Sequence, residues 1–241
     1  MNILITGASS GIGAELAARF SSPGNNLILT GRALDRLERV RSQGEGFEPG
    51  EYGWDSCKVV DGDLTDPYTL IRIEEQVRES FGGKLDLLIL SAGVYDKRDL
   101  FAEPESFADA EVVGEVIKGT LLGNLEVCLQ CLPELQAAKG QIVHINSVAG
   151  KNISPGEAVY SAAKHAMTGF LKSLRLDARN HGVRVMDVFL GGVDTPMTCN
   201  RVQHEKLMAM RAVVSVIKSN IELNHMQSLQ IEELQLGRMI F

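Results

Sequence analysis

Short apolar runs alternate with amphipathic segments along this chain of 241 residues. The apolar runs cover residues 3–5, 27–29, 59–60, 87–90, 142–145 and 183–188, and each predicts a strand. Between them, apolar residues recur with helical spacing and predict helices over residues 14–20, 34–40, 68–81, 109–135 and 158–179. Uninterrupted apolar strands that alternate with helices are typical of a parallel sheet buried on both faces. The pattern therefore predicts the α/β class, with one doubly wound parallel sheet and helices on both faces.

The end of the chain predicts one more strand over residues 229–236, where apolar and polar residues alternate roughly. Residues 44–56 are rich in turn-forming residues and also carry Phe47, Tyr52 and Trp54, which indicate a packed loop or a protein contact. Neither a repeat nor a linker divides the sequence, so we expect residues 1–241 to form a single domain.

The charge balance narrows the possible partners. The chain carries 24 lysines and arginines against 31 aspartates and glutamates, a net charge of −7, and its basic residues form no long run. A nucleic-acid partner is therefore not expected. No apolar run reaches the roughly 18 residues of a membrane-span candidate, and residues 1–5 carry no cationic leader. We expect a cytoplasmic protein without a membrane segment.

The sequence offers no disulfide framework and no metal site. Four cysteines in a chain of this length are best interpreted as reduced, small apolar residues; they are Cys57, Cys128, Cys131 and Cys199. His144 and His165 have no partner at metal-ligand spacing. We therefore predict neither disulfides nor a bound metal.

The first predicted strand ends in a glycine-rich turn. Its sequence is Thr6-Gly7-Ala8-Ser9-Ser10-Gly11-Ile12-Gly13, and it opens the following helix. Backbone N–H groups at a helix start bind a pyrophosphate, and glycine lets the backbone approach it closely. The spacing Gly-x-x-x-Gly-x-Gly departs from the more general Gly-x-Gly-x-x-Gly. The turn predicts a dinucleotide site, with a plain strand-to-helix connection as the alternative.

Tyr160 and Lys164 stand four residues apart in a predicted helix, and Ser147 lies thirteen residues before Tyr160. Residues four apart share one helix face, so the ammonium would lie beside the phenol and lower its pKa from about 10. Tyr160 is then a candidate general acid or base, with the Ser147 hydroxyl holding a carbonyl or alcohol oxygen. The alternative is a packed tyrosine beside a solvated lysine.

These motifs together resemble the short-chain dehydrogenase/reductase family, over residues 3–197. The glycine turn, Asp63, Ala92-Gly93, Ser147 and Tyr160-x-x-x-Lys164 occur in that family's order and spacing. The resemblance implies a Rossmann fold and hydride transfer to or from a nicotinamide, with Tyr160 exchanging the proton, Ser147 binding the substrate oxygen and Lys164 binding the ribose. It implies that the cofactor contacts Thr6, Gly7, Ser9, Ser10, Gly11, Ile12, Gly13, Asp63, Leu64, Ser91, Ala92, Gly93, Tyr160, Lys164, Val193 and Thr195.

Arg32 follows the second predicted strand, and the next acidic residue is Asp35. An acid at the end of this strand binds the ribose 2′-hydroxyl of NAD, whereas an arginine accepts the 2′-phosphate of NADP. Arg32 therefore predicts a preference for NADP over NAD, unless it is a surface arginine that caps the next helix. Ser10 stands where relatives that prefer NADP often carry a second basic residue.

The chain departs from the family pattern at three places. Thr120 stands where the resemblance implies an asparagine that positions a water in the proton relay, and Asn124 matches that site only if the helix is irregular. Thr120 is therefore a weak catalytic candidate, because a hydroxyl lacks the amide's two donors. Ser91 replaces an asparagine after the fourth strand, and Leu190 replaces a proline before Gly191.

We expect the substrate pocket in the segments after residues 93, 147 and 195, because connections at the carboxyl ends of parallel strands face the crevice. The basic residues near these segments, which are candidates for attracting an anionic substrate, are Lys97, Arg98, Lys151 and Arg201. The leading hypothesis is an NADP-dependent oxidoreductase that interconverts a secondary alcohol and a carbonyl compound. The alternative is a dinucleotide-binding regulatory or scaffold protein with little turnover. The resemblance also implies a homodimer or homotetramer.

Overall fold

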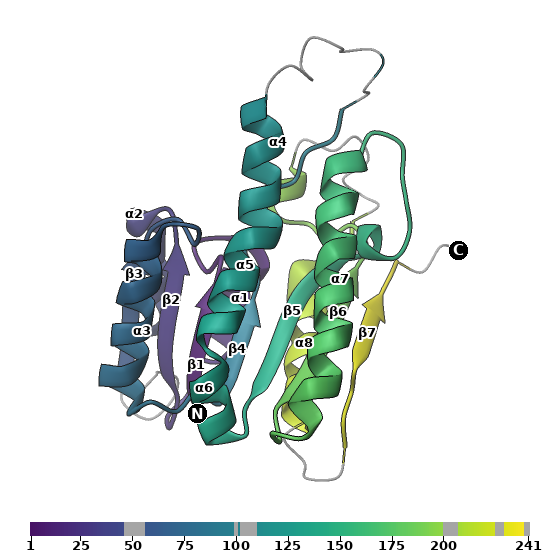
Figure 1. The fold of residues 1–241 in the computed structure, drawn as a ribbon. Coiled ribbons are helices and arrows are strands. Elements are labelled where there is room, and N and C mark those ends of the chain that lie inside the picture. The colour runs from purple at the N-terminus through teal and green to yellow at the C-terminus, as the bar shows by residue number, and fades with distance from the viewer. Residues whose placement is uncertain (46–55, 99–100, 102–109, 200–206, 225–228, 239–241) are drawn as a thin grey trace.

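The computed structural model describes residues 1–45, 56–98, 101, 110–199, 207–224 and 229–238 (Figure 1). Within them, seven parallel strands form a sheet in the order β3-β2-β1-β4-β5-β6-β7. The strands are β1 (Asn2–Thr6), β2 (Asn26–Gly31), β3 (Ser56–Asp61), β4 (Leu87–Leu90), β5 (Gln141–Ser147), β6 (Arg184–Leu190) and β7 (Glu233–Leu236). The direction of winding reverses between β1 and β4, which opens a crevice at the carboxyl ends of these strands. The predicted doubly wound parallel sheet is confirmed.

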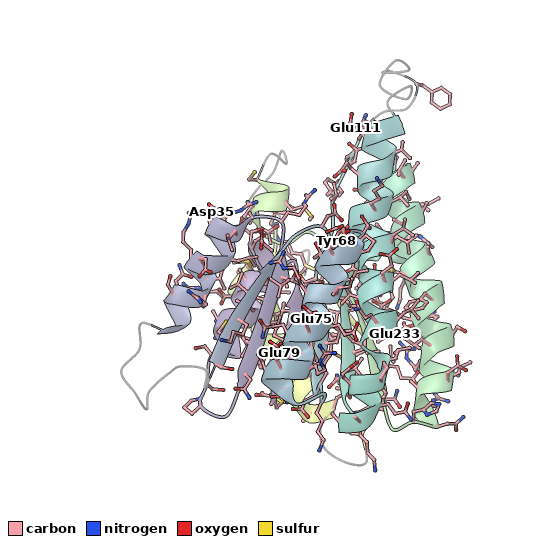
Figure 2. All side chains as sticks on the ribbon, turned by 60° about the vertical axis from the view of Figure 1, so that its left-hand side comes forward. Asp35, Tyr68, Glu75, Glu79, Glu111 and Glu233 are labelled. Atoms are coloured by element: carbon pink, nitrogen blue, oxygen red, sulfur yellow. The ribbon has the colours of Figure 1, made fainter. Side chains whose placement is uncertain are left out.

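Helices cover both faces of the sheet (Figure 1). One face carries α1 (Gly11–Arg19), α2 (Leu34–Glu45) and α8 (Met210–Asn224). The other carries α3 (Pro67–Phe81), α5 (Gly123–Gln130), α6 (Leu132–Ala138) and α7 (Ala158–Arg179). On α3 the residues labelled in Figure 2, Tyr68, Glu75 and Glu79, lie on the solvent side. The helix α4 (Ala110–Ile117) rises beyond the carboxyl ends of the strands, above the crevice.

The continuous apolar runs follow from this layering. In β1, Ile3 and Ile5 pack toward one helix layer and Leu4 toward the other, and all three are fully buried. Because both faces of the strand are covered, every position in it removes apolar surface from water. None of the helices in the described segments is long and apolar enough to cross a bilayer.

The prediction of one helix over residues 109–135 was wrong. After α4 the chain forms a π-helical segment (Lys118–Leu122), then α5 and α6. Two side chains hold this irregular part: Thr120 Oγ1 bonds both the amide and the carbonyl of Val94, each at 2.9 Å, and Asn124 Nδ2 donates to the Thr120 carbonyl at 3.1 Å. The π-helix is rare and appears mostly as single-turn bulges inside α-helices, frequently at functional sites. Pro133 is the second residue of α6, at a helix start that tolerates proline.

Two other elements differ from prediction. The last strand is β7, shorter than the expected 229–236, and it pairs in parallel with β6. The helix α8 was not predicted from the sequence, although its buried residues recur at helical spacing; they include Val213, Val214, Ile217 and Ile221. The aromatic residues at 47, 52 and 54, and Arg201, lie outside the described residues.

Candidate active site

The crevice at the carboxyl ends of the strands is a cavity of about 600 Å³. Arg32 and Asp63 line its end beyond β2 and β3. Ser147, Tyr160 and Lys164 line its end beyond β5. Its wall also includes predicted cofactor residues, namely Gly7, Ser9, Ser10, Gly11, Ile12, Leu64, Ser91, Ala92, Gly93, Val193 and Thr195. The structure thus brings together most of the residues singled out in the sequence.

The glycine turn fits a closely bound pyrophosphate. Gly7 and Gly11 have φ values of +63° and +57°, in the left-handed region that favours glycine. A Cβ on Gly7 would lie 2.7 Å from the Ala92 amide nitrogen, and one on Gly13 would lie 2.5 Å from the Gly7 carbonyl oxygen. Ser10 precedes α1, and its side chain makes no capping bond in the described structure. The first amides of α1 are therefore left to an anion in the crevice.

Three predicted site residues do not line the cavity: Thr6, Gly13 and Thr120. Thr6 is fully buried, and its hydroxyl accepts hydrogen bonds from the amides of Ser91 and Ala92 at 3.0 and 3.2 Å. It joins the end of β1 to the end of β4, where the crevice opens. Gly13 permits the contact of α1 with the turn, and Thr120 fixes the segment after β4. All three act behind the cavity wall.

The end of the crevice that Arg32 and Asp63 line carries both signs of charge. Asp63 accepts hydrogen bonds from the amide and hydroxyl of Thr65, each at 2.8 Å. These bonds, with the positive charges of Arg32 and Lys118, lower the pKa of the Asp63 carboxyl. Asp63 therefore stays ionised at neutral pH and is an acceptor for an amine or hydroxyl.

Arg32 makes an ion pair that the sequence did not suggest. Its Nη1 lies 3.2 Å from Glu115 Oε2 of α4, on the opposite side of the crevice. Both side chains are exposed, by 63% and 48%, so the pair is weak. Arg36 also lines this end of the cavity. Arg36 lies in the first turn of α2, so the start of this helix at the crevice was the available signal.

Ser147 ends β5, and Tyr160 and Lys164 belong to the first two turns of α7. Tyr160 and Lys164 are 7% and 3% exposed, and the Lys164 Nζ donates to the Ile145 carbonyl at 3.0 Å. The same Nζ lies 5.9 Å from the Tyr160 ring centroid. Burial lowers the pKa of Lys164 to about 8, and the negative charge of Asp187 opposes this effect. The ammonium is thus fixed beside the phenol, as the spacing predicts.

Two further residues adjoin the phenol. The Tyr95 ring meets the Tyr160 ring edge-on with centroids 5.0 Å apart, and the Tyr95 hydroxyl donates to Glu157 Oε1 at 2.7 Å. Both Tyr95 and Glu157 line the cavity. Sequence reasoning missed them because their roles depend on the segment after β4 folding against the start of α7. The side of the cavity next to Tyr160 therefore presents a carboxylate.

Two of the basic residues expected to attract an anion have acidic neighbours. Arg98 Nε and Nη2 bond the Asp96 carboxylate at 2.7 and 2.6 Å. The Lys151 ammonium pairs with Glu233 of β7. Their charges are largely balanced where they lie.

A doubly wound sheet whose crevice contains a glycine turn at a helix start is typical of a dinucleotide-binding protein. The model of the short chain dehydrogenase family matches residues 1–206, and this chain belongs to that family. The fold of this family binds a nicotinamide dinucleotide.

Individual sequences similar to this chain include dehydrogenases/reductases and an oxidoreductase. The chain is 32% identical over 213 residues to the mouse (Mus musculus) dehydrogenase/reductase SDR family member 7, covering 88% of this chain and 61% of that protein. It is 30% identical over 209 residues to an SDR family protein 7-like dehydrogenase/reductase of Anopheles gambiae, covering 82% and 61%. The chain thus spans about three fifths of the length of these two relatives. An uncharacterised oxidoreductase of Staphylococcus saprophyticus is 32% identical over 206 residues, covering 81% of this chain and 75% of that one.

A solved structure shares the fold. An alcohol dehydrogenase from the archaeon Thermococcus sibiricus, complexed with 5-hydroxy-NADP, superposes with a TM-score of 0.82 at 22% identity, covering 100% of this chain and 99% of that chain.

Proposed function

We propose that this chain is an oxidoreductase that transfers hydride between NADP(H) and a secondary alcohol or carbonyl compound. The observation that carries the proposal is the convergence of Ser147, Tyr160 and Lys164 in the crevice that also contains the glycine turn. When bound there, the nicotinamide dinucleotide supplies or accepts the hydride.

The chain's own residues then handle the oxygen and the proton. Ser147 holds the substrate oxygen, and its Oγ is itself oriented by a hydrogen bond from the Ala149 amide at 3.1 Å. Tyr160 gives its proton to a carbonyl oxygen or takes one from an alcohol. The Lys164 ammonium binds the ribose hydroxyls and favours the phenolate form of Tyr160. The fixed positions of all three reduce the entropy cost of the proton transfer.

Arg32 and Arg36 support NADP as the preferred cofactor. Two guanidinium groups at the end of the crevice suit a 2′-phosphate dianion. Glu115 competes for Arg32, but the exposed pair is weak enough to be exchanged for a phosphate. We therefore propose a moderate preference for NADP over NAD.

The cavity next to Tyr160 favours an uncharged substrate. Glu157 lines this part of the cavity and would repel a carboxylate. We propose a neutral carbonyl compound or alcohol as the substrate, instead of an anionic one. The pocket is formed by the segments after residues 93, 147 and 195 within one domain over residues 1–241.

Two experiments test this function. NADPH and NADH titrations should show tighter binding of NADPH, and a panel of neutral and anionic carbonyl compounds should reveal consumption of NADPH. Tyr160→Phe should abolish turnover and keep NADPH binding, with Tyr68→Phe on the exposed face of α3 as the control. If NADPH binds, no compound consumes it and Tyr160→Phe changes nothing, the regulatory or scaffold alternative holds.

We also propose that the protein is a cytoplasmic homodimer or homotetramer. Leu122, Leu129 and Leu176, on the π-helical segment, α5 and α7, are exposed by 39%, 47% and 60%. Apolar side chains on neighbouring helices suit a subunit contact. Light scattering after size exclusion would measure the mass, and a monomer would contradict this proposal.

A further inference from the structure

A carboxylate is buried beneath the candidate active site. Asp187, in the middle of β6, is 2% exposed. Its register partner on β5 is His144, which is fully buried, and His144 Nδ1 lies 2.9 Å from Asp187 Oδ1. The Asn146 amide donates to the other carboxylate oxygen, Oδ2, at 2.9 Å. Removing a charge from water costs free energy, which these hydrogen bonds offset only in part. We therefore ask what the buried carboxylate does for the site above it.

Hydrogen bonds connect the carboxylate to the backbone of the site. The Asn146 Oδ1 accepts a bond from the Ser147 amide at 2.8 Å. The Asn146 amide also donates to Thr168 Oγ1 at 3.0 Å, and that hydroxyl lies 3.0 Å from the Lys164 carbonyl oxygen on α7. Asn146 therefore links Asp187 to the Ser147 backbone directly, and to the Lys164 backbone through Thr168. A change at Asp187 would reach both Ser147 and the segment of α7 that carries Lys164.

Charge also links Asp187 to Lys164. The Lys164 ammonium is bonded to the Ile145 carbonyl, between His144 and Asn146 on β5. The negative charge of Asp187 favours this ammonium, while burial disfavours it. Burial and the Lys164 charge lower the pKa of His144, so the imidazole is neutral at pH 7. Asp187 of β6 and Lys164 of α7 are then two buried groups of opposite charge on elements that pack together.

Other charged groups near β6 have partners elsewhere. Arg175 of α7 donates to the Val185 and Glu232 carbonyls. Glu233 of β7 pairs with Lys151 and Lys172. Among the described residues, the other titratable or charged groups on β5, β6, β7, α7 and the turns beside them include His144, Lys151, Tyr160, Lys164, His165, Lys172, Arg175, Asp177, Arg179, Arg184, Glu232 and Glu233.

We propose that Asp187 is a positioning residue, a buried counter-ion that keeps Lys164 protonated and, through Asn146, fixes Ser147. Its consequence for turnover rests on the proposed function, but its effect on Lys164 does not. Removing the carboxylate charge would leave the buried ammonium unbalanced, so Lys164 would lose its proton at a lower pH. The phenolate of Tyr160 would then lose its neighbouring cation at working pH.

The first test needs no substrate. Carbon-13 NMR of the lysine Cε atoms, with Lys164 assigned through Lys164→Met, would give the Lys164 midpoint in the wild-type protein and in Asp187→Asn. The midpoint should fall by about one pH unit in Asp187→Asn, a tenfold change in proton affinity. His144→Gln, which replaces one neutral group with another, should leave it nearly unchanged. An unchanged midpoint in Asp187→Asn would overturn the proposal.

A second measurement covers the case in which Asp187→Asn does not fold. In the wild-type protein, the NMR chemical shift of the Asp187 carboxyl carbon should change as Lys164 loses its proton, because the positive charge near the carboxylate disappears. A carboxyl signal that ignores the Lys164 titration would equally overturn the proposal.

The third measurement uses turnover. In the direction of alcohol oxidation, where Tyr160 accepts the proton, the rising limb of the pH profile should move to higher pH in Asp187→Asn. A residue that only supports the fold would lower the rate equally at all pH values. If no substrate is consumed by the wild-type protein, the proposed function fails while the Lys164 titration still decides the role of Asp187.

Discussion

At the scale of single residues, the ammonium of Lys164 is held in place by burial and by a backbone hydrogen bond. It is 3% exposed and has the Ile145 carbonyl as its hydrogen-bond acceptor. Burial lowers its pKa to about 8, so its charge is present at neutral pH and is lost on the alkaline side. An ordinary core would carry an apolar side chain here. A charge kept at this cost is typical of a functional site.

Cofactor binding should therefore weaken as the pH rises through about 8, the pKa of Lys164. Below that pH the ammonium is available to the ribose hydroxyls, and above it the neutral amine is a weaker donor. We expect the dissociation constant of NADPH to rise about tenfold between pH 7 and 9, comparable to one charged hydrogen bond. Fluorescence titration at several pH values would measure it. Lys164→Met should bind weakly with no such pH dependence.

The same group affects stability with the opposite sign. Burial lowers the pKa of Lys164 to about 8 in the folded protein, from an ordinary value of 10.5. Between these values the unfolded chain binds more protons, so the free energy of unfolding rises with pH through this window. Urea denaturation of the wild-type protein and Lys164→Met at pH 8 and 10 would test this: the difference between the two proteins should change with pH. A constant difference would contradict a lowered pKa.

At the scale of elements, the interrupted helix after β4 shapes one wall of the crevice. Thr120 bonds both the amide and the carbonyl of Val94, which ties the π-helical segment to the connection after β4. Asn124 bonds the Ala92 carbonyl and accepts from the Thr6 hydroxyl at 3.2 Å. Together they hold the ends of β1 and β4 in place. Thr120 thus shapes the site without lining it.

Thr120→Val should destabilise the protein by about 1–3 kcal/mol, because it leaves the partly buried amide and carbonyl of Val94 without their side-chain partner. Thr120→Ser keeps the hydroxyl and is the matched control. Urea denaturation would measure both. Unchanged stability in Thr120→Val would contradict a role for these hydroxyl bonds.

The position of α4 above the crevice places Glu115 beside Arg32. Under the proposed preference for NADP, Glu115 would compete with the 2′-phosphate for this arginine. Glu115→Gln should tighten NADPH binding by about threefold and leave NADH binding unchanged, because an exposed ion pair contributes less than about 1 kcal/mol. Glu111→Gln, one turn earlier on the same helix, is the control; Figure 2 labels Glu111 at the far end of α4. Equal changes for NADPH and NADH would contradict a role for the 2′-phosphate.

At the scale of the whole molecule, the two helix layers decide which thiols meet solvent. Cys57, Cys128 and Cys131 are buried, whereas Cys199 is exposed. Burial raises the pKa of the Cys128 thiol to about 12 and raises that of Cys131 still further. Their Cys-x-x-Cys spacing therefore reflects packing between α5 and α3, and not thiolate chemistry.

One thiol in four should react with a disulfide reagent in the folded protein, and all four in denaturant. Because the buried thiols become accessible only on unfolding, their reaction rate should follow the free energy of unfolding as urea is added. Cys199→Ser should abolish the fast reaction. Rapid labelling of Cys128 without denaturant would contradict the packing of α5 against the sheet.

The layered sheet could be predicted from the sequence, and so could most residues of the crevice. Apolar runs such as Leu87–Leu90 that alternate with helices are typical of a parallel sheet covered on both faces, and such a sheet places the carboxyl ends of its strands on one edge. The glycine turn, Ser147 and Tyr160 follow such strand ends or begin the next helix, so local spacing was enough to bring them together. The helix α7, with Tyr160 and Lys164 four residues apart, was predicted with its observed bounds.

Only the tertiary structure decided which groups lie opposite one another across the crevice and beneath it. Glu115 meets Arg32, Glu157 meets Tyr95, and Asp187 meets His144 over separations of 43 to 83 residues. No local periodicity encodes such contacts, because they depend on how helices and strands pack. The π-helical segment has the same origin, since Thr120 bonds a residue of another element. Spacing along the chain located the acid–base pair, and packing supplied its buried counter-charge and its surroundings.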